Sequence, residues 1–199
     1  MTSGLLSRMT RSGVTTPLTI RQATADDAAR FTAIAESTFV DTFGPDNTPA
    51  DVALYCAQAF STDIQRGELL EVHHTVLFAE KGDEVVGYAM LRVESAPACV
   101  SDPAAIEIVR LYAASHLIGM GIGRALMQRC LDLAAERGHR TVWLGVWECN
   151  ARAIAFYENW GFIDVGTKAF VFGTDHQTDR VMMRTLPRIG RQGATCAIP

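Results

Sequence analysis

The sequence predicts an α+β (mixed α/β) fold, in which one sheet and its flanking helices share a single core. An early hairpin of alternating apolar residues is followed by strand and helix patterns in alternation, which is the order of a mixed sheet. The length of 199 residues fits one domain. The composition, 48% hydrophobic and 20% charged, is that of an ordinary globular domain.

The first half is expected to contain a strand, several helical segments and then a hairpin. Residues 18–24 (LTIRQAT) alternate like a strand, and Thr24 is a suitable N-cap for a helix that buries Phe31 and Ile34. The other segments expected here are a loop at 43–49, a helix opened by Thr48 and Pro49, an amphipathic helix at 61–72, and hairpin strands at 74–80 and 85–94.

The second half is expected to alternate strands with helices. Gly138 and Gly161 stand where glycine commonly ends a helix, because it accepts a positive φ. Asn150 is a good N-cap. The expected strands cover 106–114, 141–147, 162–166, 169–173 and 179–186, and the expected helices cover 122–137 and 150–160.

We expect one domain at residues 18–186 between two flexible ends, 1–17 and 187–199. Near the N-terminus the apolar run is only Leu5 and Leu6, which is too short for a signal peptide. No segment approaches the length of a transmembrane helix, so no membrane association is expected.

Charge and cysteine content narrow the functional classes. A net charge of −4 argues against nucleic acid as a partner and suits a small cationic one. The five cysteines form no C-x-x-C pair, and we interpret them as reduced thiols in a cytoplasmic protein. His73 and His74 have no spaced His, Asp or Glu partners, so no metal site is expected.

The stretch LIGMGIGRAL (117–126) places three glycines directly before a helix. The first amides of a helix are unpaired and carry partial positive charge, so glycines that let a ligand approach favour a phosphate or pyrophosphate. The G-x-G-x-x-G loop does not match, because Arg124 and Leu126 stand where its last glycine would be, and no Gly-Lys-Ser/Thr occurs. A flexible turn with close helix packing is the alternative.

The segment IEIVRLYAASHLIGMGIGRALMQRCLDLAAERG, followed by NARAIAFYENWGF, resembles the two central motifs of the GNAT superfamily of N-acetyltransferases. The resemblance implies a twisted, mostly antiparallel sheet splayed at its middle, and a loop whose amides hold the pyrophosphate of acetyl-coenzyme A (acetyl-CoA). Ile118 departs from the family pattern, which has Arg or Gln there, and this removes one polar contact. The coenzyme-binding residues implied are the backbone of Leu111, Tyr112, Ala113, Gly119, Met120, Gly121, Ile122 and Gly123, and the side chains of Asn150 and Tyr157. Arg124 follows the last glycine and could reach a phosphate, or it is a solvated arginine of the first helical turn.

Three further stretches resemble bacterial spermine/spermidine N-acetyltransferases of the PaiA type, and the likeness covers roughly residues 18–186. They are FVDTFGPDNTPADVALYCAQAF (39–60), WLGVWE (143–148) and DHQTDRVMMRTL (175–186). The resemblance implies a small-molecule amine as substrate, with a polyamine as the favoured acceptor. Peptide N-termini, amino acids, amino sugars and antibiotic amines stay open, because one fold supports many acceptor pockets.

Acetyl transfer requires that a proton leave the amine and that one reach the departing thiol. Their ordinary pKa values are about 10.4 and about 8.5, so both steps gain from a proton-transfer group. Glu107 is the base that the resemblance implies, directly or through a water, with Glu94 and Glu148 as substitutes; an ordinary strand residue is the alternative. Tyr157 is the implied acid, although a core tyrosine would fit the same pattern. Direct attack needs no covalent enzyme intermediate.

The acceptor side is expected near the end of the first helix and the loop after it. Asp41 and Asp46 would suit a cationic substrate, or they are simply solvated. Phe39, Phe43 and Trp147 could line the path of a methylene chain.

Two rival functions stay open at this level. A non-catalytic acyl-CoA sensor would explain Ile118, and a nucleotide-binding oxidoreductase is disfavoured by the glycine spacing. Strand pairing between subunits is common in such folds, so a homodimer is also considered.

Overall fold

The structure is a computed structural model, and it describes residues 16–172 and 175–187. Most of the two predicted flexible ends, 1–15 and 188–199, lies outside the described residues. The helices are α1 (Ala28–Phe43), α2 (Pro49–Ala59), α3 (Thr62–Leu70), α4 (Ile122–Glu136) and α5 (Ala151–Asn159). The strands are β1 (Leu18–Gln22), β2 (His74–Lys81), β3 (Glu84–Arg92), β4 (Ile106–Ala113), β5 (Thr141–Trp147), β6 (Ile163–Phe172) and β7 (Asp175–Thr185).

The strands form one seven-stranded sheet in the order β1-β2-β3-β4-β5-β7-β6. Only β4 and β5 run parallel, and every other neighbouring pair is antiparallel. This is the mixed, mostly antiparallel sheet that the sequence predicts.

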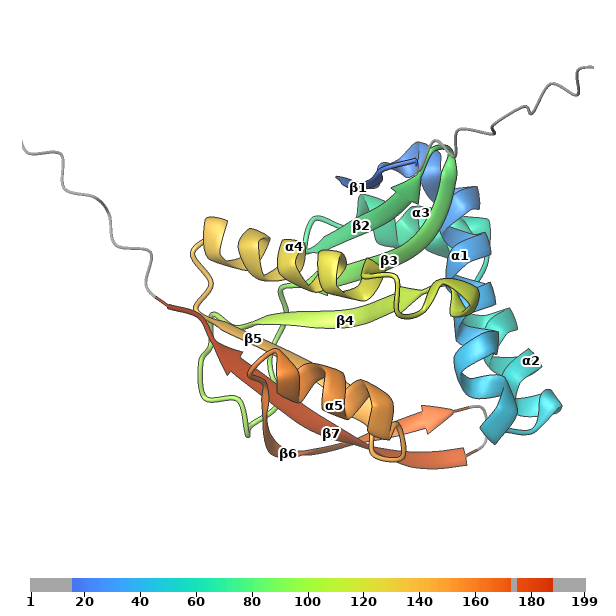
Figure 1. Cartoon of the computed structure of the whole chain (residues 1–199). Helices are drawn as coiled ribbons and strands as arrows, with labels where there is room; N and C mark the ends of the chain where they lie inside the picture. Colours follow the sequence, from blue (N-terminus) through green and yellow to red (C-terminus); the bar gives the residue numbers. More distant parts are fainter. Residues whose placement is uncertain (1–15, 173–174, 188–199) are drawn as a thin grey trace, which may run out of the picture.

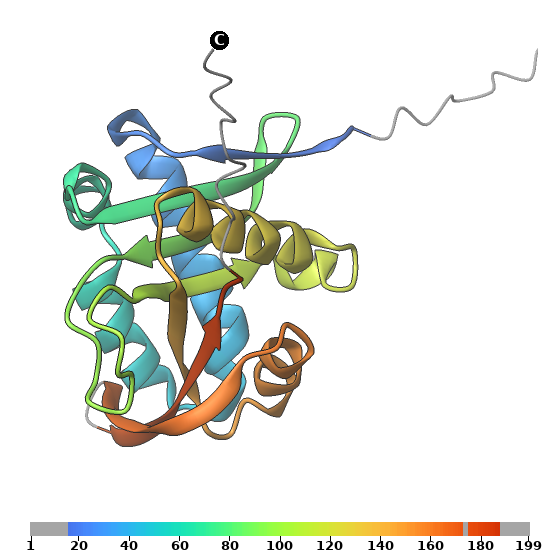
Figure 2. The same cartoon turned by 90° about the vertical axis from the view of Figure 1, so that its left-hand side faces the viewer.

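The sheet is splayed between β4 and β5. The two strands are paired only at Ile106 with Val142 and at Glu107 with Trp143. Beyond Glu107, residues 108–113 follow β3 on one edge, with a bulge at Val109, and on the other edge they have no strand partner among the described residues. Figure 2 shows β4 and β5 running in clearly different directions. A strand edge is therefore open in the middle of the sheet.

Helices cover both faces of the sheet (Figure 1). Helices α4 and α5 pack on one face, where Leu126, Met127 and Ile154 join the larger buried cluster. Helices α1 and α2 pack on the other face, where Phe31 and Phe39 join a second cluster that also contains Phe78 and Tyr88. Each side of the splay is thus walled by its own helices.

Several local predictions are confirmed. Thr48 accepts a hydrogen bond from the Asp51 amide at the start of α2, and Asn150 caps α5 through the Ala153 amide. Gly138 and Gly161 follow α4 and α5 with φ of +84° and +78°. The segment after Thr24 begins differently from the prediction, because a 3-10 turn at Ala25–Asp27 precedes α1.

The C-terminal strands differ from the prediction. The expected strands 162–166 and 169–173 form one strand, β6, because a β-bulge between Asp164 and Gly166 bends the strand without ending it. Strand β7 begins at Asp175 and not at residue 179, so Asp179 lies in its interior. Gly173, the expected end of a strand, lies outside the described residues.

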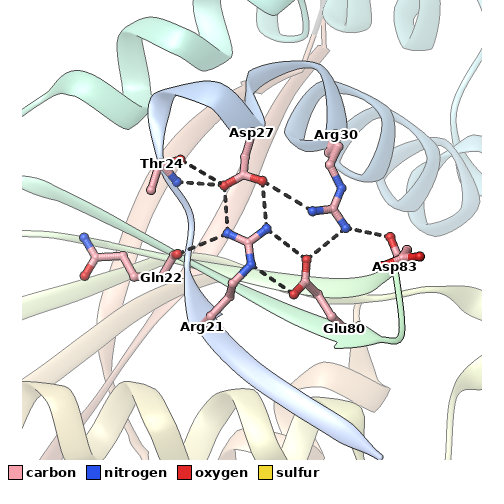
Figure 3. A network of polar contacts seen from close by, with 7 residues as sticks. All are labelled: Arg21, Gln22, Thr24, Asp27, Arg30, Glu80 and Asp83. Carbon is pink, nitrogen blue, oxygen red and sulfur yellow. Dashed lines mark hydrogen bonds and ion pairs between the residues drawn. The ribbon is translucent and has the colours of Figure 1, made fainter. Parts of the chain in front are cut away.

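An ionic network ties β1, β2 and the start of α1 together (Figure 3). Arg21 donates to both oxygens of Asp27 at 2.7 Å and to both oxygens of Glu80 at 2.9 Å. Arg30 adds a contact of 2.8 Å to Glu80 and a hydrogen bond to the carbonyl of Asp83. The guanidinium of Arg21 holds the pKa of both carboxyl groups below their usual range.

Within the described ranges, no helix is long and apolar enough to cross a membrane. In the same residues no group of three or more His, Cys, Asp or Glu side chains is placed to hold a metal ion.

Candidate active site

A cavity of about 570 Å³ occupies the splay between β4 and β5, and we call it the central cavity. It is lined from both faces of the sheet: Phe156 and Tyr157 come from the α5 side, and Phe39 and Tyr55 come from the α1 and α2 side. Its walls include Glu107, Tyr157, every predicted coenzyme-binding residue except Met120, and the predicted aromatic residues Phe39, Phe43 and Trp147. The candidate carboxylates Asp41, Asp46, Glu94 and Glu148 do not line it.

The glycine loop opens this cavity at the N-terminus of α4. Gly119 and Gly121 have φ of +89° and +86°, a conformation that side chains disfavour, which explains why glycine stands at both positions. The first helical hydrogen bond runs from the Ala125 amide to the Gly121 carbonyl. The amides of Ile122, Gly123 and Arg124 therefore have no partner within the helix, as at any helix start.

Other members of the loop behave differently. The Met120 amide already donates to the Leu117 carbonyl, and Met120 does not line the central cavity, so the structure does not place it at the site. Ile118 does line the cavity and is half exposed. Gly123 packs against Phe156, whose ring atoms would be 3.8–3.9 Å from an added Cβ.

The residues present fit acetyl-CoA. Leu111, Tyr112 and Ala113 line the cavity on the part of β4 that has no β5 partner, where an extended amide-bearing ligand can add like a strand. The free amides of α4 lie beyond the end of this edge, and they favour the negative charge of a pyrophosphate. The side-chain oxygen of Asn150 accepts the capping hydrogen bond from the Ala153 amide, which leaves the side-chain NH₂ group of Asn150 available as a donor.

Tyr157 lies on α5 and lines the central cavity. Its ring packs against Phe156 and Phe162, and its side chain is buried. Burial raises the pKa of the Tyr157 hydroxyl, so the proton is held firmly at neutral pH. The hydroxyl is thus held in the protonated form, in which it can donate a hydrogen bond to the departing sulfur and pass on its proton as the amine nitrogen supplies another.

Glu107 lies at the junction where β4 and β5 part, and it is buried rather than solvent-facing. One carboxylate oxygen accepts hydrogen bonds from Arg92 at 2.7 and 3.1 Å, and the other lies 3.6 Å from the Lys168 ammonium. Glu94 pairs with the same Arg92, and Glu148 is exposed; neither lines the central cavity.

The part of the cavity wall where the sequence predicts the acceptor side is aromatic. Phe39, Phe43 and Trp147 line the central cavity, as the sequence predicts they could. Phe39 stacks on Tyr55 with ring centres 4.4 Å apart, and Phe43 lies 6.2 Å from Trp147. Such walls suit an apolar chain.

Asp41 and Asp46 lie outside the central cavity. They line a second hollow of about 400 Å³, and Asp41 accepts a hydrogen bond from Ser115 at 2.6 Å. The two hollows share four lining residues: Thr42, Trp147, Asn150 and Arg152. The predicted carboxylates are therefore neighbours of the cavity rather than part of its wall.

Several charged residues of the central cavity were not predicted. Arg110 forms a two-bond ion pair with Glu68 at 2.8 and 2.9 Å, so its charge is balanced. Lys168 of β6 and Asp179 of β7 also line the cavity. Asp is rare within strands. A strand predicted from residue 175 would have placed Asp179 in its interior, and this unusual position was the available signal for Asp179.

Together, a splayed sheet, an open strand edge and free helix amides define the class of this protein as a coenzyme A-dependent acyltransferase. The sequence profile of the Acetyltransferase (GNAT) family matches residues 32–162. The chain belongs to the GNAT family, and it is an N-acetyltransferase.

Relatives and solved structures agree with this family. An uncharacterized N-acetyltransferase from the pepI 3' region of Lactobacillus delbrueckii subsp. lactis is 34% identical over 171 residues, which cover 86% of this chain and 99% of the relative. The ribosomal protein bS18-alanine N-acetyltransferase of Escherichia coli strain K12 is 36% identical over 67 residues, 34% of this chain and 45% of that protein. The PaiA N-acetyltransferase of Thermoplasma acidophilum, solved with coenzyme A, has a TM-score of 0.69 at 17% identity and covers 85% of this chain and 99% of its own. The structural likeness to PaiA is one of fold.

Proposed function

We propose that this enzyme acetylates a primary amine of a small molecule, with a polyamine such as spermidine or spermine as the favoured acceptor. The observation that carries the proposal is the central cavity, which joins an open β4 edge and free amides on one side to aromatic walls on the other. Acetyl-CoA enters along β4, and the amine approaches from the side of α1 and α2.

The reaction is a direct attack of the amine on the thioester. The cavity holds both reactants together, so no covalent enzyme intermediate is needed. Tyr157 protonates the departing sulfur, and Glu107 is the base that the family resemblance implies. To act in that role, Glu107 has to exchange its contact with Arg92 or Lys168 for the amine or a water.

A polyamine fits the shape and charge of the two hollows. Its methylene chain would run along Phe43 and Trp147, whose rings are apolar. A second ammonium group would then reach the hollow that contains Asp41 and Asp46, because the two hollows share Trp147 in their walls. A monoamine lacks this second contact.

An amine screen that traps the released CoA thiol tests the proposal. The acceptors are spermidine, spermine, a linear monoamine, a peptide with a free N-terminal alanine, an amino acid and an aminoglycoside. We expect spermidine or spermine to give the highest kcat/KM. The polyamine assignment is rejected if spermidine and spermine release thiol no faster than a reaction without any amine, while another acceptor is turned over.

A peptide N-terminus is the second candidate acceptor. The 67-residue match at 36% identity to the bS18-alanine N-acetyltransferase favours it. In the same screen, peptide turnover above all small amines supports this candidate. Binding of acetyl-CoA without thiol release by any acceptor would instead favour an acyl-CoA sensor.

The cytoplasm is the compartment we propose. Cys56, Cys99, Cys130 and Cys149 are free thiols, as is usual in a reducing compartment.

A further inference from the structure

Asp179 is a buried carboxylate in the wall of the central cavity. Strand β7 places it opposite Trp147 of β5 and Lys168 of β6. It is 8% exposed, and its carboxylate forms no hydrogen bond or ion pair within residues 16–172 and 175–187. Its position in the cavity wall removes the carboxylate partly from water, which disfavours its charged form.

Burial changes the pKa of the Asp179 carboxyl. It raises the pKa of the Asp179 carboxyl, while the positive charge of Lys168 opposes the rise. A carboxylate with a raised pKa holds a proton more readily than one in water does. A cationic ligand that donates to it would relieve the cost of burial.

The surroundings already accommodate a primary ammonium group. The Lys168 ammonium lies 5.4 Å from the centre of the Trp143 ring and 3.6 Å from Glu107. It also lies in the space beside Gly145, where an added Cβ would come within 2.7 Å of the Lys168 nitrogen and 3.0 Å of an Asp179 oxygen. The absence of a side chain at Gly145 therefore leaves room for the Lys168 ammonium and the Asp179 carboxylate in the cavity wall.

Asp179 and Glu107 differ in availability. Both oxygens of Glu107 already face cations, Arg92 and Lys168. Among the described residues, Lys168 is the cation that influences Asp179, and the two form no ion pair. An incoming amine would meet Asp179 without displacing a protein cation.

We propose that Asp179 binds the ammonium group of the acceptor and takes its proton, while Glu107 holds Arg92 and Lys168 in place. This inference rests on the proposed function and assigns the proton acceptor of the same reaction to Asp179 in place of Glu107. Lys168 assists by proximity, because a neighbouring cation makes the acceptor ammonium give up its proton more easily.

The proton balance of the reaction is complete without another reactant. The ammonium passes one proton to Asp179, and the neutral nitrogen attacks the thioester carbonyl carbon. The C–N bond forms, the C–S bond breaks, and the CoA thiolate takes the Tyr157 proton. The new amide nitrogen returns its second proton to Tyr157. Asp179 releases its proton to solvent, so one proton is released in each turnover.

The charged and titratable groups around Asp179 come from three other elements. They are Lys168 on β6, Tyr55 on α2, and Glu107 on β4, which acts through Lys168. Of these, Lys168 is the group whose charge lowers the pKa of Asp179 and so opposes the rise that burial causes. Its removal is thus expected to move the titration of Asp179 upward in pH.

Asp179→Asn is the direct test, with Glu107→Gln for comparison and Asp132→Asn as a matched control. Asp132 is an exposed carboxylate on α4, away from the central cavity, that accepts a hydrogen bond from Gln128. With the best amine of the screen, we expect Asp179→Asn to lower kcat/KM by about 100-fold or more at unchanged affinity for CoA. Glu107→Gln should lose less, and Asp132→Asn nothing. A folded Asp179→Asn variant within threefold of wild type overturns the proposal.

The pH profile separates a proton acceptor from a structural residue. Lys168→Met should move the acid limb of kcat/KM to higher pH, and Asp179→Asn should abolish that limb. An acid limb that is the same in both variants and in wild type also overturns the proposal.

A binding measurement distinguishes failure of this inference from failure of the proposed function. Absence of amine-dependent thiol release by the wild type rejects the enzymatic assignment. In that case, calorimetry with spermidine on the CoA-saturated protein still tests whether Asp179 binds the ammonium group. At least tenfold weaker binding by Asp179→Asn supports its role toward the ammonium group, and equal affinity rejects it.

Discussion

At the scale of single residues, Gly121 shows why the loop before α4 contains glycine. Its φ of +86° is unfavourable for a residue with a Cβ by roughly 1–2 kcal/mol. We predict that Gly121→Ala relaxes the loop, moves the free amides of α4 and weakens CoA binding by tenfold or more in calorimetry.

Gly67→Ala is the matched control for Gly121→Ala. Gly67 lies within α3, and nothing is within 4 Å of an added Cβ. Alanine should stabilise that helix by about 0.5–1 kcal/mol and leave CoA affinity unchanged. Equal CoA affinity in Gly121→Ala and wild type would show that the amides of the loop do not hold the coenzyme.

Tyr157 provides the second prediction at this scale. Its buried hydroxyl lines the cavity, and its raised pKa keeps it protonated. Tyr157→Phe should lower kcat by about 100-fold, because the thiolate loses its proton donor, while CoA affinity changes by less than threefold. Steady-state kinetics and calorimetry check the two parts. Unchanged kcat would remove Tyr157 from the chemistry.

Some site residues could be predicted from the sequence and others could not. Asn150 and Tyr157 belong to a local motif within one helix, so their relative placement follows from helix geometry. Asp41 lies outside the central cavity because its helix turns it toward Ser115 instead. Lys168 and Asp179 meet through strand pairing between β6 and β7, and a single sequence does not fix that register.

At the scale of elements, the network of Arg21, Asp27, Arg30 and Glu80 joins the first strand to the first helix. Asp27 is buried and binds Arg21 through both oxygens. Asp27→Asn should lower the free energy of unfolding at pH 7 by about 1–2 kcal/mol. This lies at the low end of the usual cost of breaking a buried charged hydrogen bond, because solvent screens the half-exposed arginines.

The pH dependence of this loss has a definite sign. The pKa values of Asp27 and Glu80 are lowered in the folded state, so their stabilising effect is full above the unfolded-state values and is lost as the pH falls below them. The difference between wild type and Asp27→Asn should therefore shrink below about pH 4. Urea unfolding between pH 3 and 7 measures it, with exposed Asp26→Asn as control. A constant difference would show that the ion pairs do not stabilise the fold.

The order of elements was largely predictable, and their ends were less so. Caps such as Thr48 and Asn150 mark helix starts because they satisfy amides locally. Strand β6 was split in the prediction because Gly166 is typical of a turn, whereas here it forms a bulge within a longer strand.

At the scale of the whole molecule, the function depends on one break in an otherwise continuous sheet. Pairing between β4 and β5 ends at Glu107 and Trp143, so the coenzyme side and the acceptor side meet in one cavity. The residues expected to bind the coenzyme lie in two sequence motifs, residues 111–124 and 150–157, and each motif is local in the sequence. The acceptor side combines side chains of α1, α2, β6 and β7, which only the fold brings together.

Amide hydrogen exchange with and without CoA tests this arrangement most directly. We predict that CoA slows exchange at residues 108–113, on the open edge of β4, and at residues 121–124, at the start of α4, because the ligand takes up these free amides. Exchange across the β1–β2 pair, away from the cavity, should stay the same. Unchanged exchange in both segments at saturating CoA, or slowing only elsewhere in the chain, would contradict the proposed binding site.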